Sequence, residues 1–238
     1  MKLKDYLRRN LVKRRNYEKL VEENETRLNL LRAFTGSSAE YFQDLWVLME
    51  LGFKHGGFFV EFGATNGVDA SNTYLLERKF QWRGILVEPN FVFHEALRGN
   101  RNSIIDNRLV WDVSNKEIDF LSMTEAYISV AKEDLKLVDI DLSTKSRVDV
   151  VNSVSLNDLL INYRAPDTID FISVDVEGSE YRILKAFFEE TKFKVRLFVV
   201  EHNWREDANL LLELFEEQGY DLVYRNISNR DFWFRLKN

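Results

Sequence analysis

The chain has 238 residues, of which 45% are hydrophobic, so it is long enough for one sizeable domain with a buried core. It contains no cysteine, which excludes disulfides, thiolate nucleophiles and cysteine-bound zinc sites. Its net charge of −6 disfavours general binding to nucleic acid, because phosphate backbones are bound by basic surfaces.

Residues 1–35 are predicted to form a basic helical extension. Apolar residues recur there at helical spacings, although polar residues interrupt the seam. Ten basic and five acidic residues lie in 1–32, so this segment carries +5 and the remainder −11. We expect the helix to pack on its own domain or to form a homodimer; contact with an anionic membrane or polyanion is the alternative. The N-terminus has no apolar segment typical of a signal peptide, and no apolar run reaches the roughly 18 residues of a membrane span, so we expect a soluble cytoplasmic protein.

A turn at residues 35–38 is predicted to separate this extension from a domain formed by residues 36–238. Ser38 is expected to cap a helix that runs to about Leu51. The apolar residues on one face of this predicted helix are Phe42, Leu45, Trp46 and Met49.

From residue 58 onward, short apolar runs alternate with helical patterns. The runs predicted as strands are Phe58–Phe62, Ile85–Val87, Ile104–Ile105 (resuming at Leu109–Val110), Ile169–Val174 and Leu197–Val200. The predicted helices are Ser71–Lys79, Phe91–Leu97, Ser155–Asn162, Ser179–Glu189 and Asp207–Gln218. Segments 220–224 and 230–236 are expected to pair as a hairpin. The alternation predicts an α/β fold with a mostly parallel sheet, helices on both faces and a mixed edge.

Residues 112–154 interrupt this alternation. We expect a strand near Ile118–Leu121 and an irregular excursion around Ser129–Arg147. Such an insert could cover a site at the edge of the sheet.

Four of the predicted strands carry polar residues at their carboxyl ends. They are Glu61, Glu88, Asp175 with Glu177, and Glu201 with His202. Ligands of open α/β sheets bind at the carboxyl ends of strands, and an unpaired buried charge is costly. Each acid alone could be a helix cap or an ion-pair partner, but four such ends at one sheet edge predict a ligand site.

The glycine-bearing turn Gly63–Gly67 allows close approach of a ligand to the backbone, although it does not match GxGxxG. Glu88 could accept both hydroxyls of a ribose, which suits NAD and S-adenosylmethionine equally. Glu61 distinguishes the two, because it would repel a pyrophosphate and attract an ammonium or sulfonium. At about 4 Å and an effective dielectric near 20, that attraction is about 4 kcal/mol before desolvation.

Five segments between Tyr41 and His202 form a specific combination: YFQDLWVL, FFVEFGATNG, SNTYLLERKFQWRGILVEPN, DNRLVW and IDFISVDVEGSEYRILKAF. Together they resemble the FkbM family of S-adenosylmethionine-dependent methyltransferases. The resemblance implies a class I methyltransferase (Rossmann-like) fold with a seven-stranded sheet. The first 35 residues lie outside the family pattern.

The resemblance also implies which residues hold the cofactor. Those around its methionine moiety would be Glu61, Gly63, Ala64, Asn66 and Gly67. Glu88, followed by Pro89, would hold the ribose, and Asn107 would lie near adenine, next to Arg108 where the family usually has a small residue. Asp175 would face the methionine end or the acceptor.

Methyl transfer to a hydroxyl needs a base or a metal to help remove the proton. Asp175, Glu177 and His202 are the candidates at strand ends, and an imidazole pKa of about 6.5 would suit a base. Alternatively, Asp175 with Glu177 or Glu201 could hold Mg²⁺, since hard cations prefer oxygen ligands. Glu177 could instead cap the helix that follows it.

The acceptor is expected to be a small molecule or glycan. Methyltransferases of nucleic-acid bases commonly carry an Asn/Asp-Pro-Pro-aromatic loop after the fourth strand, where this chain has DVEG. The leading hypothesis is O-methylation of a hydroxyl on a sugar or another polar natural product. The alternatives are an enzyme that uses NAD or a nucleotide sugar, against which the missing GxGxxG counts, and a non-catalytic cofactor-binding module.

Overall fold

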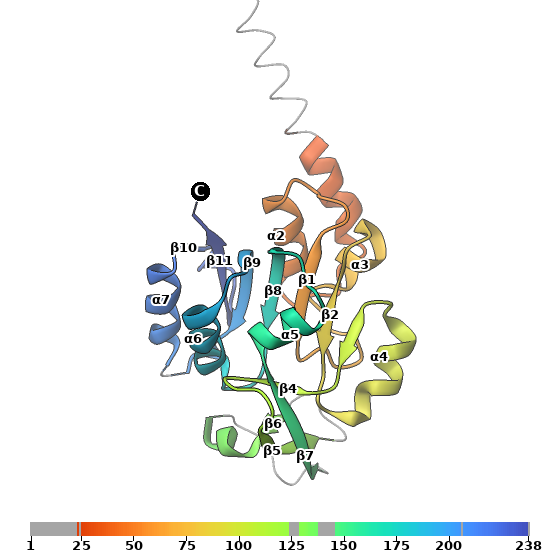
Figure 1. Cartoon of the computed structure of the whole chain (residues 1–238). Coiled ribbons are helices and arrows are strands. Elements are labelled where there is room, and N and C mark those ends of the chain that lie inside the picture. Colours follow the sequence, from red (N-terminus) through yellow and green to blue (C-terminus); the bar gives the residue numbers. More distant parts are fainter. Residues whose placement is uncertain (1–22, 24, 124–128, 138–145, 206, 238) are drawn as a thin grey trace, which may run out of the picture.

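The computed structural model describes residues 23, 25–123, 129–137, 146–205 and 207–237. A seven-stranded sheet forms its centre, in the order β10-β11-β9-β8-β1-β2-β3 (Figure 1). Its strands are β1 Phe58–Phe62, β2 Arg83–Val87, β3 Ile104–Asp106, β8 Thr168–Val174, β9 Lys194–Glu201, β10 Tyr220–Val223 and β11 Asp231–Leu236. The five strands from β9 to β3 are parallel, whereas β11 is antiparallel to β9 and to β10. The predicted parallel sheet and closing hairpin are confirmed.

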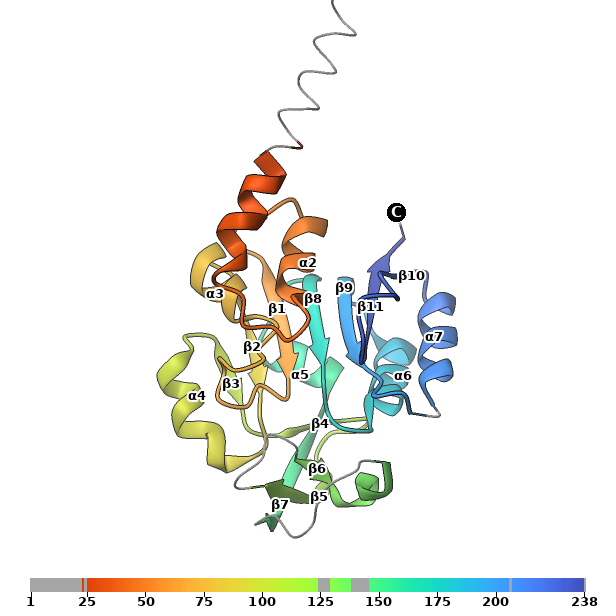
Figure 2. The same cartoon turned by 180° about the vertical axis from the view of Figure 1, so that it is seen from behind.

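Helices cover both faces of this sheet (Figures 1 and 2). Their bounds are α2 Gln43–Glu50, α3 Tyr74–Phe80, η1 Phe91–Phe93, α4 His94–Asn100, α5 Leu156–Asn162, α6 Glu180–Glu190 and α7 Ala208–Glu217. Side chains alternate across β1, so that Val60 joins a core cluster with α5, α6 and α7, whereas Phe59 joins a second cluster with α2, α3 and α4. The sheet therefore separates two cores and leaves its carboxyl edge free for a site.

A second, four-stranded sheet lies beyond that carboxyl edge, at the bottom of Figure 1. It has the order β4-β7-β5-β6, with β4 Leu109–Trp111, β5 Glu117–Met123, β6 Val130–Ala131 and β7 Ser146–Ser155; the 3-10 helix η2 is Lys132–Leu137. The strand expected near Ile118–Leu121 is confirmed as part of β5. Leu109–Val110 does not continue β3, because β4 leaves the main sheet and pairs with β7. Residues 138–145 of the predicted irregular excursion lie outside the described residues.

The helix expected to begin after Ser38 begins later, at Gln43. Phe42 precedes it with a left-handed φ of 60°, and the Ser38 hydroxyl donates to the Ser71 carbonyl at 3.2 Å instead of capping. The buried residues of α2 are Gln43, Asp44, Leu45, Trp46, Val47 and Leu48. Met49 is 43% exposed, so the predicted buried face of this helix was partly wrong.

Most of the predicted N-terminal helix lies outside the described residues, and so does the homodimer contact proposed for it. A described helix ends at Phe34, and its Ala33 is buried in the cluster with α2 and α3. Within the described residues, no helix is both long and apolar enough to cross a membrane.

Candidate active site

A cavity of about 840 Å³ opens at the carboxyl ends of β1, β2, β8 and β9. This volume lies in the upper part of the roughly 300–1,000 Å³ range of small-molecule sites. The loops after β1 and β2 form one wall, the loops after β8 and β9 form another, and the second sheet adds Phe120 and Ser129. The insert at residues 112–154 therefore does border the site, as expected from the sequence.

Gly63 lies where the ends of β1 and β8 approach each other beside the cavity. Its φ is +67°, and a Cβ atom placed on it would lie 2.5 Å from the Asp175 carbonyl oxygen. A larger residue would push the β1 loop away from β8. Gly63 and the following Ala64 both line the cavity, and their place beside the methionine moiety stays a prediction.

Glu88 lies at the end of β2 in the cavity lining and is 3% exposed. The backbone N–H groups of Thr65 and Asn90 donate to its carboxylate at 2.7 and 2.8 Å. Burial raises the pKa of Glu88 to about 7, against the opposite effect of those two hydrogen bonds. Glu88 and its neighbour Pro89 are thus placed to meet a polar group, such as a pair of hydroxyls, inside the cavity.

Glu61 does not line the cavity, although the sequence predicted a direct role for it. Ser71 and Thr73 donate hydroxyl hydrogen bonds to its carboxylate, and the Asn72 N–H donates at 2.6 Å. The Arg101 guanidinium lies 3.6 Å from the same carboxylate. Because these partners neutralise and enclose Glu61, its charge holds the β1 loop together rather than facing a cationic ligand.

Three other predicted residues also lie outside the cavity lining. The Asn66 side chain accepts from the N–H groups of Val68 and Asp69, so it shapes the turn itself. Gly67 has a φ of +80°, and a Cβ atom there would lie 2.6 Å from the Arg101 side chain. Asn107 is exposed. Asn66 and Gly67 therefore support the loop, and the structure does not bring Asn107 to the cavity.

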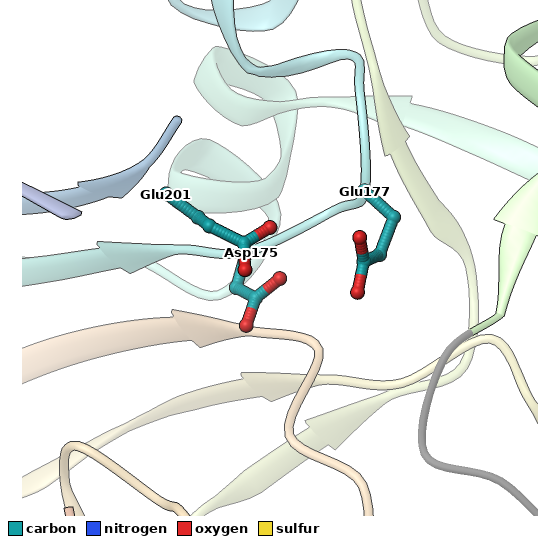
Figure 3. Close-up of side chains that lie close together, drawn as sticks. All are labelled: Asp175, Glu177 and Glu201. Carbon is teal, nitrogen blue, oxygen red and sulfur yellow. The ribbon is translucent and has the colours of Figure 1, made fainter. Parts of the chain in front are cut away.

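The side chains of Asp175, Glu177 and Glu201 lie close together (Figure 3). All three line the cavity, beyond β8 and β9 and on the opposite side of β1 from Glu88. An oxygen from each lies within 4.8 Å of the others. The Asp175 side chain is exposed at the cavity, but the surrounding protein still desolvates its carboxyl group. This desolvation, followed by repulsion from Glu201 and Glu177, raises the pKa of Asp175 well above the usual range. Burial and neighbouring carboxylates likewise raise the pKa of Glu201 to about 8. At neutral pH such a cluster shares protons instead of carrying three full charges.

Glu177 has two properties that are common among active-site residues, a strained backbone and a raised pKa. Its φ of +59° is in the left-handed region, which costs a non-glycine residue roughly 1–3 kcal/mol. Burial and repulsion from Glu180 raise the pKa of Glu177 to about 7, while Arg205 and Arg230 act in the opposite direction. A carboxylate with this pKa in a cavity can accept a proton near neutral pH.

His202 does not line the cavity. Its ring stacks on Phe232 with 4.0 Å between centroids, and its Nδ1 accepts from the Trp204 N–H at 3.0 Å. Burial, together with Arg205 and Arg225, lowers the pKa of His202. His202 therefore lies outside the cavity lining, and its contacts hold the loop after β9; its predicted catalytic role stays a prediction.

The family model of the FkbM methyltransferase domain matches residues 61–222. The chain belongs to this family. Its sheet order, its cavity at the carboxyl edge and its family membership together identify it as a class I methyltransferase, for which S-adenosylmethionine is the methyl donor.

Two solved structures are similar to this FkbM-family chain at 13% identity. One is a precorrin-6y C5,15-methyltransferase from Geobacter metallireducens GS-15, with a TM-score of 0.42 over 80% of this chain and 84% of that one. The other is a proposed RNA methyltransferase from Pyrococcus horikoshii, with a TM-score of 0.39 over 82% of each chain. The comparison with curated proteins returned no match.

Several residues that line the cavity of this FkbM methyltransferase were missed by sequence reasoning. They include Glu40, Phe120, Ser129, Trp204 and Arg230. Trp204 had a detectable signal, because it follows the polar end of β9 directly. Glu40 and Arg230 had none, since they reach the cavity only through the packing of the N-terminal segment and of β11.

Proposed function

We propose that this methyltransferase transfers the methyl group of S-adenosylmethionine to a hydroxyl oxygen of a sugar or another polar small molecule. The observation that carries the proposal is a single cavity with Glu88 at one end and the carboxyl groups of Asp175, Glu177 and Glu201 at the other. Such a cavity has room for a nucleoside and a second ligand. A cytoplasmic location stays a prediction from the sequence.

The cofactor is proposed to lie between these two ends. Glu88 would accept the ribose hydroxyls, and the backbone of Gly63 and Ala64 would border the methionine moiety. The apolar residues Val110 and Phe120 would contact the adenine from the second sheet. Because Glu61 is already neutralised, the attraction for the sulfonium and ammonium is assigned instead to the negative charge that remains on the cluster of Asp175, Glu177 and Glu201.

The reaction is an in-line displacement. The acceptor oxygen forms a bond to the methyl carbon as the sulfur–methyl bond breaks, and the sulfur leaves as the neutral thioether of S-adenosylhomocysteine. Alignment of the three atoms supplies most of the acceleration. The hydroxyl proton passes to the Glu177 carboxylate, which lines the cavity and whose pKa of about 7 suits that transfer.

Calorimetric titration tests the cofactor assignment. We expect binding of S-adenosylmethionine and S-adenosylhomocysteine and no binding of NAD, with Glu88→Ala weakening both interactions. Release of S-adenosylhomocysteine in the presence of a panel of sugars and other hydroxyl compounds then tests turnover. Tight NAD binding would favour a nucleotide-dependent enzyme, and cofactor binding without turnover on any acceptor would favour a non-catalytic module.

The carboxyl cluster also allows a test of the Mg²⁺ alternative. Its three oxygens could ligate a hard cation, but burial and repulsion between the acids raise the pKa of Asp175 and of Glu201, and a proton on either acid competes with a metal ion. We therefore expect turnover to be unchanged after treatment with EDTA. A loss that added Mg²⁺ restores would make these acids metal ligands.

A further inference from the structure

Trp204 presents an exposed aromatic surface inside the cavity. It is 65% exposed and belongs to the cavity lining. All five tryptophans of the chain lie among the described residues, and the other four are at most 3% exposed. An uncovered indole in a concave site is a surface that a ligand can cover.

Backbone hydrogen bonds support the loop that carries Trp204. The N–H groups of His202 and Asn203 both donate to the Arg230 carbonyl, at 2.8 and 3.2 Å. The Trp204 N–H donates to His202 Nδ1, and Asn203 and Trp204 have φ values of 41° and 52°. Because His202 is itself stacked on Phe232, the indole is presented by a fixed support.

Arg230 links Trp204 to the carboxyl cluster. Its guanidinium carbon lies 5.8 Å from the indole centroid, and its charge stabilises the ionised form of Glu177. Among the described residues, it is the one cationic side chain in the cavity lining. The acids in that lining are Glu40, Asp69, Glu88, Asp175, Glu177 and Glu201. The surroundings of Trp204 thus combine an apolar face with hydrogen-bonding groups and a predominance of negative charge.

We propose that Trp204 is the acceptor platform of this site and that it binds the ring of a neutral sugar. The assignment rests on the methyl transfer proposed above. The C–H groups on one face of a pyranose would pack on the negative face of the indole, while Arg230 and Asn203 would hydrogen bond to hydroxyls at its edge. The acids of the cavity disfavour anionic sugars, and a planar phenol would leave these polar groups unpaired.

Fluorescence quenching tests the platform without any need for turnover. Because Trp204 is the exposed tryptophan, acrylamide should quench mainly its emission. With the protein saturated in S-adenosylhomocysteine, a methyl α-glycoside of glucose, galactose, mannose or rhamnose should shield Trp204 from acrylamide. Glucose 6-phosphate and catechol should shield it less than the best glycoside does.

Kinetics with matched variants test the same assignment. Trp204→Ala should raise the acceptor KM about tenfold, as expected for loss of one aromatic contact, and leave the affinity for S-adenosylmethionine unchanged. Trp204→Phe should recover most of the loss because it restores a flat face. Tyr224→Ala is the control, since Tyr224 is 47% exposed but lies outside the cavity lining.

The two assays separate this proposal from the proposed function. If glycosides shield Trp204 but are not methylated, the assignment of Trp204 as a sugar-binding surface stands and the proposed reaction is wrong. If methyl transfer occurs but Trp204→Ala changes the acceptor KM by less than about twofold, the proposed reaction stands and the assignment of Trp204 is wrong. Shielding by catechol and by none of the glycosides would also overturn the sugar assignment.

Discussion

At the residue scale, the acids of the cavity differ in their pKa values and therefore in their ability to accept a proton. Glu177 has a pKa of about 7, so a large part of it is ionised at neutral pH, whereas Glu201, with a pKa of about 8, stays mostly protonated. Asp175 has its pKa raised by burial and by both neighbours. Glu177 is therefore the group best suited to accept a proton, and the other two set its electrostatic surroundings.

Glu177→Gln should lower turnover by roughly 10²–10⁴-fold, the usual contribution of a general base, with little change in the affinity for S-adenosylmethionine. In the unmodified enzyme, turnover should rise as the pH increases through about 7, because Glu177 then loses its proton. The measurements are initial rates across pH and calorimetric titration. Glu189→Gln, on the exposed side of α6, is the control. A variant with unchanged turnover and pH profile would remove Glu177 as the base.

His202→Phe tests the positioning role assigned to His202. Phenylalanine can keep the stack on Phe232 but cannot accept the Trp204 N–H, so the loop after β9 should loosen. We expect the acceptor KM to rise a few-fold while kcat keeps its value. A collapse of kcat at unchanged KM would instead return His202 to the catalytic residues.

At the element scale, Arg101 joins the segments around the loop between β1 and α3. It follows α4, pairs with Glu77 of α3 at 3.0 Å, donates to the Gly67 carbonyl at 3.0 Å and lies near Glu61 of β1. Its side chain is fully buried. One guanidinium thus balances two buried carboxylates and sets the shape of the turn between β1 and α3.

Arg101→Ala should lower the free energy of unfolding by about 3–5 kcal/mol, because it leaves buried carboxylates without their partner. Chemical denaturation measures this loss, and Arg98→Ala provides an exposed control on α4. Equal stability of the two variants would show that the Glu61 and Glu77 charges are satisfied without Arg101.

The contacts of the N-terminal helix bear on where the domain begins, and truncated chains test this boundary. Ala33 is buried and Leu30 packs against the same cluster as α2 and α3, so a boundary after residue 35 cuts through a packed contact. We expect a chain of residues 25–238 to keep the melting temperature and cofactor affinity of the full chain. A chain of residues 36–238 should melt at a lower temperature. Equal melting of both chains would support the boundary predicted after residue 35.

At the scale of the whole molecule, several buried acids make stability depend on pH. Burial raises the pKa of Asp44 and of Asp231 to about 6, of Glu88 and Glu177 to about 7, and of Glu201 to about 8. Between the lower unfolded pKa values and these folded values, the folded protein binds more protons than the unfolded chain. Its stability should therefore decrease as the pH rises from about 5 to 8.

Differential scanning calorimetry of the cofactor-free protein checks this sign. The melting temperature should be several degrees higher at pH 6 than at pH 8.5, and Asp44→Asn, which lies outside the cavity lining, should reduce the difference. A melting temperature that rises over the same range would mean that ion pairs outweigh the buried acids.

Much of the main sheet could be predicted from local pattern. The apolar run Phe58–Phe62 is β1 without a change of boundary, because all five of its residues are buried between two helical layers. The strand β7 was missed because its pattern is not that of a buried strand: Val148 and Val150 are 49% and 65% exposed. Its formation depends on pairing with β4 and β5, which the local sequence does not encode.

The sequence by itself determined the alternation of strands and helices, and it placed acids at the strand ends that meet at one edge, since both follow from short-range hydrophobic pattern and parallel topology. The tertiary structure alone decided which of those acids line the cavity. Glu61 is neutralised by Arg101, forty residues further along the chain, whereas Glu177 and Glu201 share a cavity. Burial and charge pairing are properties of neighbours in space, so the same residue type supports a loop at one strand end and lines the cavity at another.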